Sequence, residues 1–139
     1  MGAQGSAEPV KSVDTNLLVR VIVKDDPVQT PIAAAAFERP VFVSHGVIME
    51  TEWVLRSRYR LPREEICGAL KRLLLDVETV KVAERELVAW SLERYAAGAD
   101  LDDMLHIVAS RGSEAFLTFD KGLVDAAGPG SPTPVEGLS

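Results

Sequence analysis

The sequence has little of what a disulfide framework, a cysteine-based zinc site or a membrane anchor requires. Its 139 residues include one cysteine, Cys67, so an internal disulfide and a cysteine cage for zinc are excluded. The helical pattern around Cys67 predicts a buried and inert thiol. No apolar run approaches the roughly 18 residues that cross a bilayer, and the first residues lack the apolar core of a secretory signal. We therefore expect no membrane partner and a cytoplasmic location.

Positive charge is also scarce. The chain has 15 Lys and Arg residues against 21 Asp and Glu residues, which gives a net charge of -6. This balance argues against a protein that binds nucleic acid by neutralising its phosphates directly. A bound divalent cation would remove the objection, because it inverts the local field of a carboxylate cluster and accepts phosphate oxygens itself.

One compact domain is the organisation that length and composition favour, because 47% hydrophobic and 26% charged residues are ordinary for a globular chain. We expect a flexible leader over residues 1–9, the domain over 10–127 and a turn-rich tail over 128–139.

Apolar runs and helical patterns alternate along the domain. The predicted strands lie at 10–14, 41–43, 79–83 and 115–120, and the predicted helices at 15–23, 28–38, 44–58, 62–75, 84–97 and 100–111, with a short one after residue 120. Such alternation implies parallel pairing with crossover helices. The predicted fold class is therefore α/β, a three-layer α/β/α sandwich with a mainly parallel central sheet of four to five strands.

Two aspartates end predicted strands. Asp14 follows the first strand in VKSVD, and Asp120 follows the last strand in AFLTFD. Each is also a suitable N-cap for the helix that comes next, since Asp is favoured at that position. Both also belong to the carboxyl edge of a parallel sheet, where α/β proteins bind ligands. The alternative to two separate N-caps is therefore that Asp14 and Asp120 belong to one binding site.

Two glutamates of the helix predicted over 44–58 lie on different faces, where each face is a row of residues spaced three or four positions apart. Glu50 interrupts an apolar row that includes Val47. A partly buried and unpaired carboxylate there would be costly unless a cation lay nearby. Glu52 is four residues before Arg56, and we interpret that spacing as a solvated ion pair on the surface.

Three aspartates lie within four positions of the stretch GADLDDMLHIVAS, residues 98–110. Helical spacing places Asp100 and Asp103 on one row beside the apolar stripe, and Asp102 on a row with His106. Asp100 and Asp103 are therefore candidates for a site, while Asp102 and His106 fit a simple surface pair. Acids in the first turn are also favoured by the helix dipole, which leaves a structural role open for Asp100.

A site built from carboxylates alone suits Mg²⁺ or Mn²⁺ rather than zinc. His106 has no second histidine at ligand spacing, so we interpret it as structural. Arg20 and Lys121 are candidates for contact with a phosphate, although solvated surface charge is the simpler interpretation of both.

Four segments, VDTNLLVRVIVKDDP, METEWVLRSRY, GADLDDMLHIVAS and FLTFDKGL, resemble the successive motifs of PIN-domain proteins, in particular VapC-type toxins of bacterial toxin–antitoxin pairs. The resemblance covers roughly residues 10 to 127. It implies a PIN-like nuclease domain, a Mg²⁺- or Mn²⁺-dependent endoribonuclease that acts on RNA, a homodimer, and a cognate antitoxin whose tail covers the active site.

The resemblance also assigns roles to individual residues. The implied catalytic acids are Asp14, Glu50, Asp100, Asp103 and Asp120. All of these except Asp100 are implied metal ligands, and Glu50 or Asp100 would orient or deprotonate the attacking water. Asn16 and Thr118 match polar positions that support the acidic ring. The sequence departs from the family at Asp102, where a small or apolar residue is usual, and in having a leader.

Two other functions stay open. One is a receiver-like or phosphatase-like domain that uses Mg²⁺ in phosphoryl transfer to an aspartate, which needs a basic residue placed to neutralise the phosphate. Lys121 adjoins Asp120, but across a turn. The other is a non-catalytic PIN-like binding module, against which the acids at all four motifs argue.

Overall fold

Strands and helices alternate along the chain, as the sequence predicts, in a computed structural model that describes residues 9–139. Most of the predicted leader, residues 1–8, lies outside the described residues. The elements in chain order are β1 (Lys11–Ser12), α2 (Thr15–Val23), α3 (Gln29–Ala36), β2 (Val41–Phe42), α4 (His45–Ser57), α5 (Arg63–Lys71), the π-helical turn η1 (Arg72–Asp76), β3 (Val80–Lys81), α6 (Arg85–Ala96), α7 (Leu101–Ala109), β4 (Phe116–Thr118), α8 (Gly122–Ala127) and β5 (Val135–Gly137).

The strands described in residues 9–139 form two parallel sheets. In the first sheet β2 lies between β1 and β3, with Val41 opposite both Lys11 and Val80. In the second, β4 pairs with β5, and Phe116 lies opposite Val135. The α/β class and the parallel pairing are confirmed. The strands are divided into groups of three and two, whereas we predicted four to five in one central sheet.

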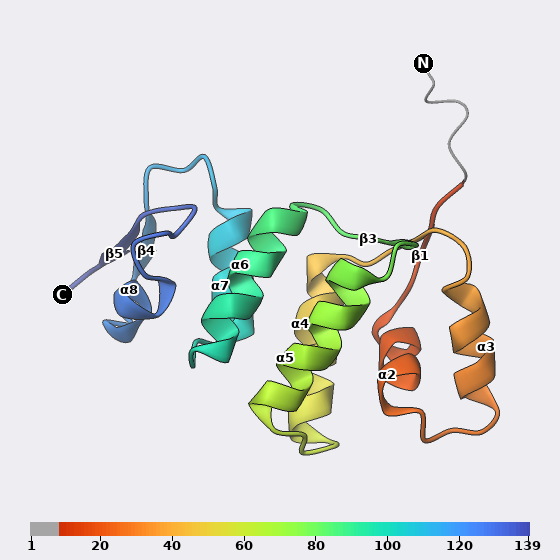
Figure 1. The fold of residues 1–139 in the computed structure, drawn as a ribbon. Coiled ribbons are helices and arrows are strands. Elements are labelled where there is room, and N and C mark those ends of the chain that lie inside the picture. Colours follow the sequence, from red (N-terminus) through yellow and green to blue (C-terminus); the bar gives the residue numbers. More distant parts are fainter. Residues whose placement is uncertain (1–8) are drawn as a thin grey trace.

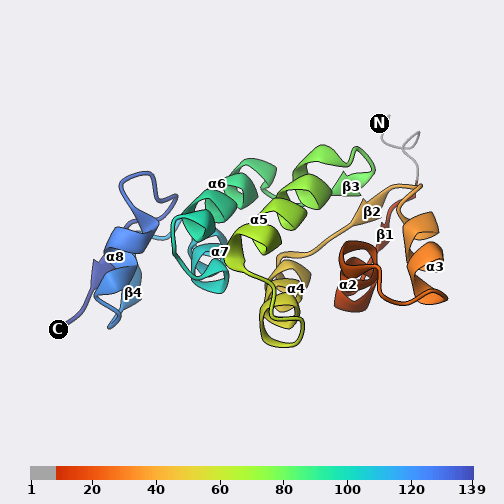
Figure 2. The ribbon, with the colours of Figure 1, turned by 60° about the horizontal axis from the view of Figure 1, so that its bottom comes forward.

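The molecule is elongated, and its two sheets lie toward opposite ends (Figures 1 and 2). α2 and α3 lie beside the first sheet, followed by α4 and α5 and then by α6 and α7 (Figure 1). The β4, α8 and β5 elements occupy the far end (Figure 2). The carboxyl ends of β1 and β4 are therefore not on a common sheet edge.

Two apolar clusters explain this division. The main cluster joins the first sheet to α2, α4, α5 and α6, with Leu18, Ile48, Leu55, Ile66 and Leu92 fully buried. The second cluster holds β4, α8 and β5 against α6 and α7 through Met104, Ile107, Leu123, Phe116 and Val135. Two hydrogen bonds reinforce the second contact: Thr133 Oγ1 donates to the Ile107 carbonyl at 3.0 Å, and Arg94 Nε donates to the Ala126 carbonyl at 2.7 Å.

Local sequence signals set the starts of two helices and one turn between helices. Asp14 caps α2 by accepting from the Leu17 N–H at 3.1 Å, and Ser44 caps α4 by accepting from the Val47 N–H at 3.2 Å. Gly98 has a φ of 116°, which disfavours any side chain, and it forms the turn that leads from α6 into α7.

Three further predictions concern single segments. Cys67 is 5% exposed, as predicted for an inert thiol. The segment 128–139, expected to be a turn-rich tail, contains turns and also the strand β5, which pairs with β4. No helix in the described part of the chain combines the length and the apolar character that a membrane span needs.

Candidate functional site

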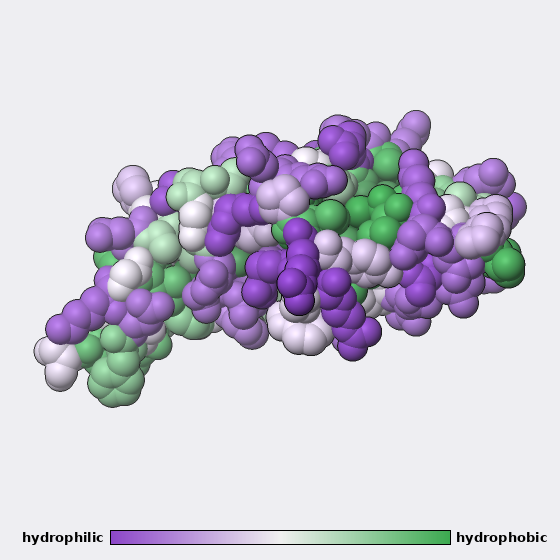
Figure 3. Space-filling model, turned by 90° about the horizontal axis from the view of Figure 1, so that it is seen from below, coloured by the Kyte–Doolittle hydropathy of each residue, from purple (hydrophilic) through white to green (hydrophobic). Residues whose placement is uncertain are grey.

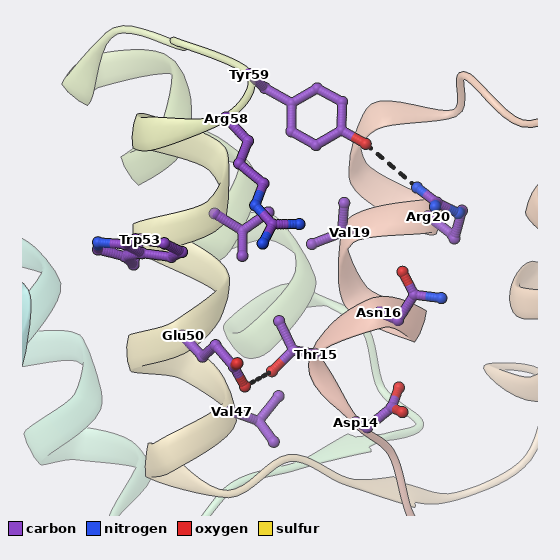
Figure 4. Close-up of a pocket in the computed structure, with 11 residues that line it drawn as sticks. Asp14, Thr15, Asn16, Val19, Arg20, Val47, Glu50, Trp53, Arg58 and Tyr59 are labelled. Carbon is purple, nitrogen blue, oxygen red and sulfur yellow. Dashed lines mark hydrogen bonds between the residues drawn. The ribbon is translucent and has the colours of Figure 1, made fainter.

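A cleft of about 500 Å³ lies between α2 and α4 and is lined by three of the predicted site residues (Figure 4). Asp14 and Asn16 line it from the start of α2, and Glu50 lines it from α4. Thr15 Oγ1 donates a hydrogen bond to Glu50 Oε1 at 2.6 Å across the cleft. The structure thus brings Asp14, Asn16 and Glu50 to one site, although they come from separate segments of the sequence.

Asp14 combines the two roles that its position allowed. It is the N-cap of α2, and its exposed carboxylate also lines the cleft. A carboxylate has two acceptor oxygens, so capping through Oδ1 is compatible with cation binding through Oδ2.

The far part of the same cleft is basic and aromatic. Arg20 and Arg58 line it together with Tyr59 and with Trp53, which is 49% exposed (Figure 4). Arg20 Nη1 donates to the Tyr59 hydroxyl at 3.3 Å, and Arg20 Nε donates to Gln29 Oε1 at 2.7 Å. The hydrogen bond with Tyr59 raises the pKa of Arg20. Arg20 also forms ion pairs with Asp25 at 3.6 Å and with Asp26 at 4.0 Å, so Arg58 contributes more of the net positive charge at this end of the cleft.

The burial of Glu50 and Glu52 is the reverse of the prediction. Glu50 is exposed, and Glu52 is 7% exposed. The ion pair between Glu52 and Arg56 is present at 2.8 Å, but Glu52 also accepts a 3.0 Å hydrogen bond from the buried Tyr95 hydroxyl. These two donors satisfy the carboxylate, so Glu52 can lie on the buried face of α4. The predicted partial burial of Glu50 and the predicted solvent exposure of Glu52 were therefore both wrong.

A second acidic group lies at the start of α7. Asp100, Asp102 and Asp103 each offer a carboxylate oxygen, and these oxygens lie within 4.8 Å of one another. Partial burial raises the pKa of Asp103, and the negative charges of Asp102, Asp100 and Asp120 raise it further. Repulsion within this group makes it a suitable place for a cation. Helical spacing placed Asp102 on a different row from Asp100 and Asp103, but its carboxylate belongs to the same cluster as theirs.

Asp120 lies near this second group and is held by its own loop. The Asp120 N–H donates to Thr118 Oγ1 at 2.9 Å, and Asp120 Oδ1 accepts from the Gly122 N–H at 3.0 Å. Thr118 thus fixes the backbone of Asp120, a contact consistent with its predicted supporting role.

The predicted site residues therefore form two groups in one chain. The first contains Asp14, Asn16 and Glu50, and the second contains Asp100, Asp103 and Asp120 with Thr118. Asp120 is distant from Asp14 because β4 pairs with β5 rather than with β1. A smaller cleft of about 320 Å³ connects the groups along α4, since Glu50 lines it together with Asp102 and His106.

Sequence reasoning did not select four residues of the main cleft, namely Thr15, Trp53, Arg58 and Tyr59. Thr15 and Trp53 had a usable signal, because they lie within the DTN and E-x-x-W segments already singled out. Arg58 and Tyr59 follow α4 and also lie within a selected segment, METEWVLRSRY, of which they are the last two residues.

An α/β fold with carboxylates gathered beside a cleft is typical of proteins that hold a divalent cation. A profile of the PIN domain matches residues 11–129, which is most of the chain. This protein belongs to the PIN domain family, whose members are typically metal-dependent nucleases with acidic metal-binding residues. Comparisons with curated proteins and with solved structures gave no match.

Proposed function

We propose that this protein is a metal-dependent endoribonuclease, a hydrolase that cleaves RNA phosphodiester bonds as the VapC-type toxin of a toxin–antitoxin pair. One observation carries the proposal. The main cleft has the carboxylates of Asp14 and Glu50 at one end and the guanidinium groups of Arg20 and Arg58 at the other.

The available ligands fit Mg²⁺ or Mn²⁺. The donor atoms are carboxylate oxygens, which these cations prefer, and those of Asp100, Asp102 and Asp103 lie within 4.8 Å of one another. The residues proposed to hold the cation are Asp14 and Glu50 of the main cleft and Asp103 and Asp120 of the second group, which share one cation only where the two groups are brought together. When bound, the cation supplies a nucleophilic water near neutral pH and neutralises charge on the phosphate.

The other residues of the cleft position the substrate. Arg20 and Arg58 provide donors for phosphate oxygens, and Trp53 offers an exposed ring on which an unpaired base can stack. The 2.6 Å hydrogen bond from Thr15 holds the Glu50 carboxylate where it can accept a proton from the attacking water. A bound cation together with the Arg58 guanidinium would answer the objection raised by the net charge of -6.

Cleavage of a structured RNA in the presence of Mg²⁺ or Mn²⁺ tests the nuclease. The wild-type protein should cut, and Asp14→Asn should cut at least 100-fold more slowly, since loss of one metal ligand removes several kcal/mol of transition-state stabilisation. Asp125→Asn on α8 is the matched control, because it changes an exposed aspartate far from the cleft and should keep full activity. Absence of metal-dependent cutting by the wild type would instead favour the non-catalytic binding module.

The toxin role rests on the four motifs and needs a test in cells. Expression of the protein should arrest growth, and Asp14→Asn should not. The proposed antitoxin is the product of a short neighbouring reading frame, and co-expression of that product should restore growth by covering the cleft. Growth arrest that persists in Asp14→Asn would separate any toxicity from RNA cleavage.

A further inference from the structure

Two strand edges are unpaired within the described residues. β1 pairs with β2 on one side, and β4 pairs with β5 on one side. An unpaired edge presents a row of backbone donors and acceptors that readily adds another strand. Both edges belong to parallel sheets, so the two could join in the same direction.

Exposed apolar side chains flank these edges. Val10 precedes β1 and is 50% exposed, while Leu117 in β4 and Phe119 just after it are 58% and 79% exposed. Apolar residues are visible at the end of the molecule formed by β4, α8 and β5 (Figure 3). Burial of such residues would stabilise a contact between the edges.

The two edges also lie next to Asp14 and Asp120, which separate sheets keep apart within one chain. Asp14 comes two residues after β1, and Asp120 comes two residues after β4. Parallel pairing of β4 with β1 would align their ends and so place these aspartates together.

We propose that a second copy of this chain supplies the missing strand, so that β4 of each copy adds to β1 of the other and each active site combines residues of both chains. The proposal rests on the nuclease function proposed above. Each site would then contain Asp14 and Glu50 from one copy and Asp103 and Asp120 from its partner.

A second copy fits this role better than the same chain does. The β4, α8 and β5 elements are anchored on α7 of their own chain by the cluster around Met104 and Ile107 and by the bond from Thr133. A strand from the same chain would reach β1 only after that packing was broken, whereas two intact copies can exchange equivalent contacts around a two-fold axis.

Mixed dimers provide the decisive experiment. Asp14→Asn and Asp120→Asn chains, carrying different affinity tags, are co-expressed and purified through both tags. Each variant alone should be inactive. The mixed dimer should recover about half of the wild-type rate, because one of its two sites then has neither substitution. Recovery of no activity, or failure to obtain any protein that carries both tags, would overturn the proposal.

Thiol cross-linking tests the strand contact independently of catalysis. Ser12→Cys and Leu117→Cys chains are mixed and treated with a short bis-maleimide, with the parent protein as the control for the buried Cys67. A linked dimer should form, and pairing Ser12→Cys with the exposed position Glu93→Cys should give none. Linkage within one chain of the Ser12→Cys, Leu117→Cys double variant would overturn the proposal. An inactive wild type that still cross-links between chains would reject the nuclease function alone.

Discussion

Thr15 donates a hydrogen bond from Oγ1 to Glu50 Oε1 at 2.6 Å and so joins the first turn of α2 to α4. The two residues are 35 positions apart in the sequence. This contact holds the Glu50 carboxylate at the edge of the main cleft, which Asp14 lines from the start of α2 (Figure 4). The position of Glu50 therefore depends on a residue that lies next to Asp14 in the chain.

Thr15→Val keeps the shape of the side chain and removes this hydrogen bond. We expect RNA cleavage to slow about fivefold to tenfold, which corresponds to roughly 1 kcal/mol of transition-state stabilisation. Thr15→Ser retains the hydroxyl and should keep most of the activity. Equal cleavage rates for Thr15→Val and the wild type would show that the bond does not position Glu50.

Glu50 and Glu52 make a matched pair for separating function from stability. Glu52→Gln removes the negative charge from a buried contact with Arg56 and Tyr95 and should lower the free energy of unfolding by about 1–3 kcal/mol. Glu50→Gln changes an exposed side chain and should leave that free energy within about 0.5 kcal/mol of the wild type. Urea denaturation measures both, and the opposite ranking would contradict the assignment of burial.

Glu50 is exposed and Glu52 is buried, the reverse of what we predicted, and this difference shows what helical spacing alone can and cannot predict. The rows of α4 were available from the sequence, and Glu52 shares its row with Ile48 and Leu55, which are both fully buried. The assumption that a charged residue faces solvent overrode this pattern. Tyr95, the second partner of Glu52, is 43 positions away, and no local pattern shows that contact.

The same distinction holds for the fold. Capping residues and apolar periodicity predicted α4 and α7 to within two residues of their observed ends. They did not predict that β4 would pair with β5, because strand pairing depends on which apolar faces meet across the whole chain. The set of acidic residues was therefore predictable, whereas their division into two groups was not.

Like-charge repulsion at Asp103 predicts an effect of substitution on the metal-free protein. Asp103→Asn removes one charge from the cluster with Asp100 and Asp102 and should raise the melting temperature by about 1–4 °C, as expected for up to roughly 1 kcal/mol in a chain of this size. Mn²⁺ should raise the melting temperature of the wild type and have little effect on the variant. A destabilised metal-free Asp103→Asn protein would contradict the repulsion.

Tyr95 predicts the behaviour of the protein at alkaline pH. Burial, and then the negative charge of Glu52, raise the pKa of its phenol above the ordinary value of 10.0. The folded state thus keeps this proton where the unfolded chain loses it, so the contribution to stability is complete below pH 10 and is lost as the pH rises further.

Phenolate absorbance measured during an alkaline titration checks this behaviour. The wild type should show a rise in absorbance above pH 10 from Tyr95. This rise should be absent in Tyr95→Phe and present in Tyr59→Phe, the variant of the other tyrosine in the chain. Ionisation of Tyr95 near its ordinary pKa would show that the phenol is not held in the buried contact with Glu52.

The most direct test of the account is the rate of RNA cleavage as Mn²⁺ is added to metal-free protein, measured for the wild type, Glu50→Gln and Glu52→Gln. We predict that the wild-type rate rises from the background to a plateau and that Glu50→Gln stays at least 100-fold below it. Glu52→Gln, measured at a temperature where it is folded, should follow the wild-type curve. A wild-type rate that does not respond to Mn²⁺, or a Glu50→Gln curve that matches the wild type, would contradict a metal-dependent nuclease centred on this cleft.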